Sequence, residues 1–454
     1  MILKAGPEAL TDLVEFLDPF TSLLQRSQSR HALERYTTGL LADLPRKTAS
    51  DLGRSIAGTN GQRLQEFLTR TQWDPRALDH LRVGRMVAHA SVGLGVEIID
   101  DTGIAKKGTH SVGVARQYSG TLGRVDNCQV LVTSHYVDRS FDWPITARLY
   151  LPEPWTQDAE RLEAAKVPRG TTFKTKGEIA LDLIDAGIAA GVPTWAVVAD
   201  AGYGDQPVLL NGLEERGLPY LVGVASSTRF RLAQDVESDP GPQPPPPYQG
   251  QGRPRRPRSL EDRVPSDEAS DLLEAFPSDA WSSISWREGS KGRLAKSFLR
   301  VRVYRVGLRG KHLPSSGWLI GQRPLPGHGG EPKFFFVWGL DSFSLQELVT
   351  LAHCRWVIER FYQDAKGELG LDDYEGRFWT GLHRHVALVM LAHCYLAWRR
   401  SHSRDESQGI ESSWVSEPDE GMSPTPVTGF PPEAPREYSG LAAGCTRVVI
   451  LTSH

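Results

Sequence analysis

The order of apolar segments between residues 92 and 200 constrains the fold of this chain more than any other feature. Residues 92–99, 128–136 and 145–151 read as strands, and their short connections predict an antiparallel meander. A helix with one apolar side follows over residues 180–188, and a fully apolar strand follows it over residues 194–199. Three strands, a helix and a strand in this order predict an α/β fold with a mixed sheet.

Acidic residues follow the first and the last of these strands. The sequence Asp100-Asp101-Thr102-Gly103 comes after the first strand, and Asp200 comes directly after the last. Ligands of open α/β sheets bind at the carboxyl ends of the strands. We therefore expect the two acidic positions to converge if their strands are neighbours in the sheet.

A helix predicted over residues 355–366 carries a third acid. Its polar stripe consists of Arg355, Glu359 and Lys366, and positions four and seven apart on a helix lie within about 40° of each other. The apolar stripe on the same helix has the spacing of an amphipathic helix. Taken alone, the polar stripe describes surface ion pairs worth at most about 1 kcal/mol. Considered together with the two acidic positions after the strands, the polar stripe indicates part of a catalytic site.

Composition narrows the class of protein and its partners. The chain has 454 residues, of which 39% are hydrophobic and 24% charged, with a net charge of −3. Because the net charge is slightly negative, a nucleic acid would have to bind local basic patches of the surface. The four cysteines show no metal-binding spacing, which favours reduced thiols and a cytoplasmic protein. We find no signal peptide and no run of membrane-spanning length, so no membrane partner is expected.

The N-terminal 88 residues read as helices studded with basic side chains. Trp73-Asp74-Pro75 contains a helix start, with Asp74 as cap. Either the basic residues form a solvated face, or they grip phosphates as a DNA-binding domain. They are Arg26, Arg30, Arg35, Arg46, Lys47, Arg54, Arg63 and Arg70.

The second half of the chain divides into a β-rich part and a helical part. Residues 240–258 are rich in Pro and Gly and predict a mobile loop, either an inert linker or, through its arginines, a DNA contact. Strands are predicted at 298–306, 317–321 and 333–338, and helices at 342–352 and 386–398. The tail from about residue 402 has the composition of a disordered segment. The predicted division is 1–88, 89–230, 231–340, 341–400 and 401–454.

Asp101, Asp200 and Glu359 supply hard oxygen ligands from three separate elements. Such sets prefer Mg²⁺ or Mn²⁺ to zinc. Two such ions, about 3.5–4 Å apart, can activate a water or a 3′-hydroxyl and stabilise the leaving oxygen of a phosphodiester displacement. Arg355 and Lys366 would then hold substrate phosphates. No phosphate-binding loop, zinc-protease motif or serine-hydrolase motif competes with this set.

These motifs resemble those of bacterial insertion-sequence transposases of the DDE class, which have a ribonuclease-H-like core. The Tyr-x2-Arg-x3-Glu-x6-Lys signature of one branch is matched at Arg355, Glu359 and Lys366, but Ala352 stands in place of the tyrosine. Four further patterns fit: Asp101-Thr102-Gly103, residues 123–129, Asp200-Ala-Gly-Tyr203-Gly204 and residues 370–377. The resemblance covers about residues 10–400, and in it residues 1–88 correspond to a helical DNA-binding domain and 231–340 to a β-rich insertion.

The resemblance implies a mechanism and partners. A homodimer would bind the terminal inverted repeats of its element, nick the DNA with metal-activated water and join the freed 3′-hydroxyl to target DNA, in the bacterial cytoplasm at the nucleoid. In related transposases an aromatic residue beside the signature arginine stacks on a flipped base. Trp356 matches that position, and core packing is the alternative.

Neighbouring residues offer rival assignments. Asp100 and Asp101 point to opposite faces of a strand, so only one is expected to be a ligand. The Asp-Thr pattern favours Asp101, with Asp100 solvated or capping, and Asp205 as the cap of the next helix. Lys106 and Lys107 are either a charged hairpin or contacts to the DNA backbone.

Two other functions fit the same residues. One is a DNA-binding protein derived from a transposase and without catalysis, and the other is a metal-dependent nuclease that cannot join strands. An assay with supercoiled donor and target plasmids and Mg²⁺ separates them by joined products, nicks alone or a gel shift without cleavage.

Overall fold

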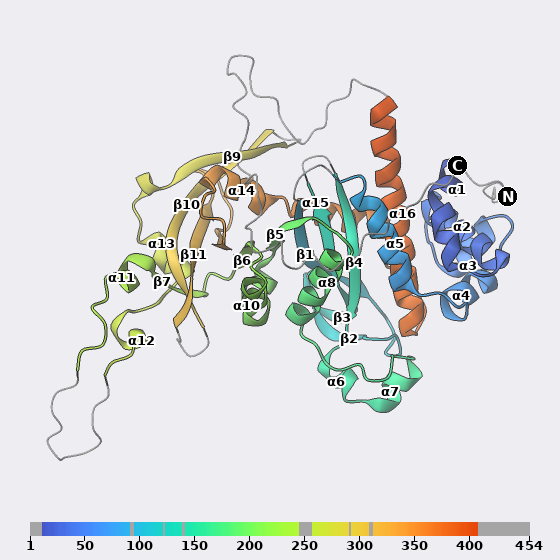
Figure 1. Ribbon diagram of the computed structural model, residues 1–454, viewed down its shortest axis with the longest axis horizontal. Helices are drawn as coiled ribbons and strands as arrows, with labels where there is room; N and C mark the ends of the chain where they lie inside the picture. Colours follow the sequence, from blue (N-terminus) through green and yellow to red (C-terminus); the bar gives the residue numbers. More distant parts are fainter. Residues whose placement is uncertain are drawn as a thin grey trace, which may run out of the picture.

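The fold is a long mixed sheet with helices on both faces (Figure 1). The computed structural model describes residues 11–90, 95–120, 123–138, 141–244, 257–289, 292–307 and 312–406. Within these ranges no helix is long and apolar enough to cross a membrane.

Six strands build the core of the sheet. They are β1 (Gly95–Ala105), β2 (Ala115–Ser119), β3 (Arg124–Val137), β4 (Asp142–Tyr150), β5 (Thr194–Ala199) and β6 (Tyr220–Val224). β1, β5 and β6 are parallel neighbours, and β3 pairs antiparallel with β1 and carries β4 and β2 on its other side. The predicted mixed sheet flanked by helices is therefore confirmed, and its strand order fits a ribonuclease-H-like core.

Helices cover the two faces of this core with separate hydrophobic clusters. One face carries α8 (Lys176–Ala189), α9 (Ala201–Gly204) and α10 (Pro207–Glu215), and the other carries α15 (Trp356–Gly367) and α16 (Trp379–Glu406). β1 contributes to both clusters, because Ile98 packs with α15 and α16 whereas Ile99 packs with α8 to α10. Alternate residues of β1 thus face opposite helix layers.

Residues 11–87 are helical and pack against α16 (Figure 1). The helices are α1 (Thr11–Leu17), η1 (Asp18–Leu23), α2 (Ser27–Leu41), α3 (Ala49–Ser55), α4 (Gly61–Thr69) and α5 (Pro75–Val87). Asp74 caps α5 as expected, since its carboxylate accepts a hydrogen bond from the Arg76 amide. Arg35 and Lys47 are buried, so these two cations do not belong to a solvated basic face.

The β-rich part after β6 continues the same sheet. Its elements are β7 (Arg229–Leu232), α11 (Ala233–Glu237), α12 (Leu260–Arg263), β8 (Asp267–Glu268), α13 (Ala269–Glu274), η2 (Ser278–Ala280), β9 (Ser282–Gly289), β10 (Gly292–Val306), β11 (His312–Arg323) and β12 (Lys333–Trp338). β12 pairs antiparallel with β6, so the twelve strands form one sheet and the inserted strands are fixed to the core by backbone hydrogen bonds.

α14 (Leu345–His353) leads from the inserted strands into α15. Ser344 begins it with a capping box, in which the Ser344 hydroxyl accepts from the Glu347 amide and the Glu347 carboxylate accepts from the Ser344 amide. α14 thus begins three residues after the start of the helix predicted over residues 342–352. The remaining helices, α6 (Glu153–Thr156) and α7 (Ala159–Ala164), lie between β4 and α8.

The elements differ from those predicted at β1 and β2. β1 does not end at the aspartates but runs on to Ala105, because residues 102–105 stay paired with β3. β2 was not predicted, since its five residues are too polar to show a strand pattern. The loop predicted at 240–258 stays a prediction, because residues 245–256 lie outside the described part; α11 and α12 lie on either side of it.

Two further expectations also need correction or stay open. Asp205 does not cap α10, because its carboxylate accepts from the Thr228 hydroxyl at 2.6 Å while Gln206 occupies the cap position. α16 continues to Glu406, beyond the predicted start of the tail, and residues 407–454 lie outside the described part.

A buried acid on β1 gives a pH-dependent prediction. Glu97 accepts hydrogen bonds from Ser134 at 2.6 Å and Thr194 at 2.9 Å, and its burial raises its pKa to about 7. A carboxyl whose pKa rises on folding stabilises the fold at low pH and loses that contribution as the pH rises through the folded value.

We expect Glu97→Gln to gain stability relative to the wild type between pH 5 and pH 8, by about 2 kcal/mol. Urea unfolding at the two pH values measures the change. A stability difference that is the same at both would contradict this explanation.

Candidate active site

Asp100 lies on the face of β1 that α15 covers. Its carboxylate is 2.8 Å from a terminal nitrogen of Arg355, and the residue is 7% exposed. Asp100 is therefore neither solvated nor a cap, contrary to our expectation. Burial raises the pKa of Asp100 to about 6; Arg355 opposes this shift and the negative charge of Asp200 adds to it.

Arg355 contacts two acids and is affected by the charge of a third. It stands at the start of α15, pairs with Asp100 and lies 3.6 Å from the carboxylate of Glu359 one turn along the helix. Burial opposes its charge, but Asp100, Asp200 and Glu359 together raise the pKa of Arg355 above its ordinary value. The nitrogen Nε of Arg355 is buried without a hydrogen-bond partner among the described residues.

Asp200 follows β5 directly, as predicted, and begins α9. Its Oδ1 accepts a hydrogen bond from the Gly202 amide at 2.9 Å. The turn packs closely on β6, because a Cβ on Gly204 would lie 1.7 Å from the carbonyl oxygen of Gly223. Only glycine fits there, which explains the second glycine of the Asp200-Ala-Gly-Tyr-Gly pattern.

Glu359 projects from the first turn of α15 and its side chain is 60% exposed. In the described part of the chain, no three His, Cys, Asp or Glu side chains come together closely enough to hold a metal ion. Asp100 and Glu359 each approach the guanidinium of Arg355, and Asp200 affects it through its charge. Carboxylate oxygens are nevertheless the type of donor that a hard divalent cation prefers.

Asp101 points to the opposite face of β1, away from Arg355. Its Oδ2 is 2.8 Å from the ammonium of Lys176 on α8 and 3.4 Å from the hydroxyl of Tyr203 on α9. The geometry thus favours Asp100 over the predicted Asp101 as the partner of Asp200 and Glu359. The sequence did not indicate Lys176 or the contact of Tyr203 with Asp101. Ile98 and Ile99 gave no signal for which aspartate faces α15, because both are buried.

The predicted DNA-binding lysines differ in their surroundings. Lys366 donates a hydrogen bond to the carbonyl of Gly103, and Lys106 donates one to the carbonyl of Tyr374. Burial lowers the pKa of both. Lys107 is exposed. The first two thus tie α15 and the following loop to β1, and only Lys107 presents its side chain chiefly to solvent.

Trp356 is the first residue of α15 and is half-buried. The guanidinium of Arg287 on β9 lies 4.3 Å from the centre of its ring, and that of Arg360 lies 5.9 Å away. The ring therefore already carries cation–π contacts that join α15 to the inserted strands.

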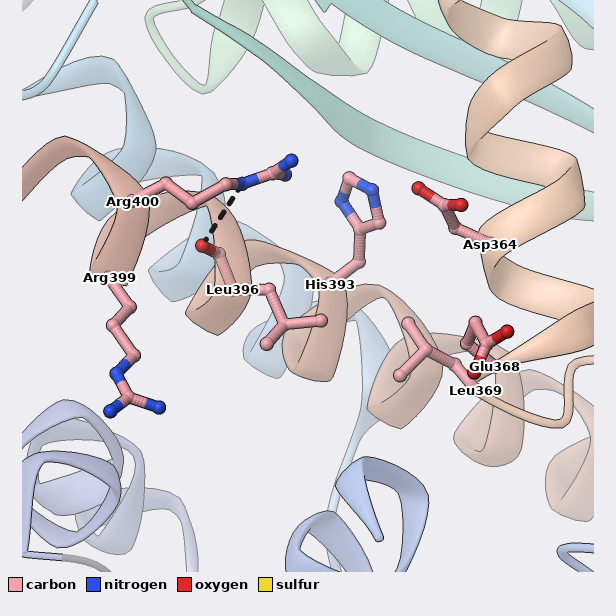
Figure 2. Close-up of a pocket in the computed structure, with 7 residues that line it drawn as sticks. All are labelled: Asp364, Glu368, Leu369, His393, Leu396, Arg399 and Arg400. Carbon is pink, nitrogen blue, oxygen red and sulfur yellow. Dashed lines mark hydrogen bonds between the residues drawn. The ribbon is translucent and has the colours of Figure 1, made fainter. Parts of the chain in front are cut away.

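A cavity of about 610 Å³ opens between α15 and α16. Figure 2 shows His393 at its centre, with the two arginines on the α16 side and Asp364 and Glu368 on the α15 side. None of Asp100, Asp200 and Glu359 lines it, so it is separate from the cluster around Arg355. Its lining residues are Asp364, Glu368, Leu369, His393, Leu396, Arg399 and Arg400.

Comparison with known families decides the affiliation of the chain. Residues 19–293 match the family described as DDE superfamily endonuclease. The chain belongs to the DDE superfamily of endonucleases. The matched region of this DDE endonuclease contains Asp100, Asp101 and Asp200, whereas Glu359 lies beyond its end.

A named relative comes from Microchaete diplosiphon. The protein called a probable transposase for insertion sequence element IS701 is 32% identical over 226 residues, which is 49% of this chain. The aligned part spans 57% of the length of that relative. The Tyr-Arg-Glu-Lys branch remains a prediction, because neither comparison distinguishes it.

Proposed function

We propose that this DDE endonuclease is a transposase that cleaves the ends of an insertion sequence and joins the 3′-hydroxyl to target DNA. The observation that supports the proposal is that Arg355 pairs with Asp100 and lies near Glu359, while the charge of Asp200 also raises the pKa of Arg355. These acids come from two parallel neighbouring strands and from the helix packed on them. The likeness to a probable IS701 transposase supports the same activity.

In this proposal Asp100, Asp200 and Glu359 hold Mg²⁺ or Mn²⁺. Two such ions supply the activation of water and the stabilisation of the leaving oxygen when bound. Arg355 contributes a positive charge beside the acids and binds a phosphate of the scissile strand. Asp101, the ligand predicted from the sequence, pairs instead with Lys176 on the other face of β1.

Further contacts to DNA are assigned by exposure. The exposed Lys107 binds the DNA backbone. Trp356 on α15 and Arg287 on the inserted strands form a flat cationic surface near the acids. Lys366 and Lys106 support the site from within through Gly103 and Tyr374. The exposed arginines of the N-terminal helices, such as Arg26, bind the terminal repeats. We also propose that a homodimer binds the two ends of the element together.

Supercoiled donor and target plasmids with Mg²⁺ test this function. We expect joined products that depend on the metal and on the ends of the element, because the proposed site performs both cleavage and transfer. Products are resolved by gel electrophoresis and sequenced across the junctions, and EDTA provides the metal-free control.

Two other results would overturn the transposase proposal in different ways. Metal-dependent nicks that never give joined molecules would identify a nuclease without strand joining. A gel shift of end DNA without any cleavage would identify a DNA-binding protein that has lost catalysis.

A further inference from the structure

The carboxylate of Asp101 is held by two groups from two other elements. The ammonium of Lys176 lies 2.8 Å from its Oδ2, and the hydroxyl of Tyr203 donates to the same oxygen at 3.4 Å. Side-chain exposure is 18% for Asp101 and 28% for Lys176, and Tyr203 is 1% exposed. The three side chains form a small polar cluster on the α8 face of the sheet.

This cluster connects the two backbone segments that carry the proposed ligands. Asp101 follows Asp100 on β1, and Tyr203 stands three residues after Asp200 on α9. The hydrogen bond between Tyr203 and Asp101 therefore links the strand of one ligand to the turn of the other. β1 and β5 are neighbours, but their backbone pairing covers only residues 95–99 of β1 and leaves the aspartates beyond it.

Lys176 adds a third fixed element. It is the first residue of α8, which begins with a capping box between Thr175 and Glu178. The amide of the next residue, Gly177, donates to Gln206 Oε1 at 2.8 Å, just after α9. The lysine is thus held on a rigid helix start that also contacts the turn after Asp200.

The positive charge of Lys176 also compensates one of two adjacent carboxylates. Asp100 and Asp101 are adjacent carboxylates, and each has its own cation on its own side of the sheet. Arg355 compensates Asp100 and Lys176 compensates Asp101, at 2.8 Å in both cases. Without Lys176, Asp101 would lose this ion pair, and the repulsion between the neighbouring carboxylates of Asp100 and Asp101 would be stronger.

We propose that Tyr203 and Lys176 are positioning residues that act through Asp101 to fix Asp100 and Asp200 relative to each other. The inference rests on the proposed function, because it assigns the ligand role to Asp100. Outer residues that orient metal ligands commonly change metal affinity or activity by about 10–100-fold when removed. Asp101 touches neither the metal nor the substrate in this account.

The experiment measures Mn²⁺ affinity by isothermal titration calorimetry on the full-length protein. Tyr203→Phe removes one hydroxyl, and Lys176→Met removes one charge at nearly constant length. We expect each to raise the dissociation constant for Mn²⁺ about tenfold while the melting temperature in EDTA stays close to that of the wild type. The kcat for nicking should fall with KM for DNA unchanged, and Lys176→Arg should restore much of the loss.

Matched controls separate positioning from general loss of a polar contact. Tyr220 is also a buried phenol that donates to a carboxylate, that of Glu214 at 2.7 Å, and Lys174 pairs with Asp182 at 2.6 Å. Neither contact touches the cluster around Asp101. Tyr220→Phe and Lys174→Met should therefore bind Mn²⁺ like the wild type.

The other outcomes contradict either the positioning role or the proposed function. Wild-type affinity in both Tyr203→Phe and Lys176→Met would overturn the positioning role while leaving the proposed function intact. Loss of Mn²⁺ binding in Asp101→Asn as complete as in Asp100→Asn would make Asp101 a ligand and also overturn it. A wild-type protein that binds no Mn²⁺ would contradict the proposed function itself, and the positioning role with it.

Discussion

Replacing Asp100 with Asn is expected to slow strand nicking on the order of 10³-fold, whereas Asp101→Asn should slow it only about tenfold. Loss of a metal ligand removes several kcal/mol of transition-state stabilisation, and each 1.36 kcal/mol corresponds to a factor of ten in rate. Asp101 instead supports its neighbour through Lys176 and Tyr203. Initial rates of plasmid nicking in Mg²⁺ measure both variants.

The comparison is sharp because the two variants make the same chemical change at adjacent residues. Asp200→Asn and Glu359→Gln should resemble Asp100→Asn, since all three are proposed ligands. Binding of end DNA, measured by gel shift, should persist in all of them. If Asp101→Asn lost nicking as severely as Asp100→Asn, or Asp100→Asn retained it, the assignment of the first ligand would be wrong.

Arg355→Ala is expected to lower the free energy of unfolding in EDTA by about 3 kcal/mol at pH 8. The substitution leaves the carboxylate of Asp100 buried without its cation, and removing one partner of a buried pair is costly. Mn²⁺ should recover more stability in this variant than in the wild type, because the metal replaces the missing positive charge. Urea unfolding with and without Mn²⁺ measures both effects.

Arg302→Ala serves as the control for an exposed pair. Arg302 on β10 pairs with Asp341 in the turn after β12, and the two side chains are 32% and 61% exposed. Such surface pairs contribute about 0–1 kcal/mol, so this variant should unfold nearly like the wild type. Equal losses in the two variants, or no additional Mn²⁺ effect in Arg355→Ala, would show that Arg355 does not act as the counter-ion of the acids.

Much of the fold could be predicted from local patterns. β12 matches its predicted bounds because its apolar run is bounded on both sides, and α14 falls at the helix predicted over residues 342–352, although it begins at Leu345. The end of β1 was misplaced, because Thr102-Gly103 reads as a turn in isolation. Pairing with Leu131 and Val130 on β3 keeps it extended, and this long-range contact leaves no trace in the local sequence.

The site was predicted by element but not by residue. Asp200 follows β5 and Glu359 lies on α15, as predicted, and their role as ligands stays a proposal. The choice between Asp100 and Asp101 depended on which side of β1 receives α15, which the tertiary packing decides. Lys366 was expected to face substrate but donates to Gly103, since a helix stripe gives direction around the axis and not the neighbour that lies there.

The most direct test of the account is the location of Mn²⁺ in crystals of the protein, measured by anomalous diffraction. The account predicts a peak bounded by the carboxylates of Asp100, Asp200 and Glu359, on the α15 face of the sheet. A peak coordinated by Asp101 on the α8 face, or no peak near any of these acids at saturating Mn²⁺, would contradict it.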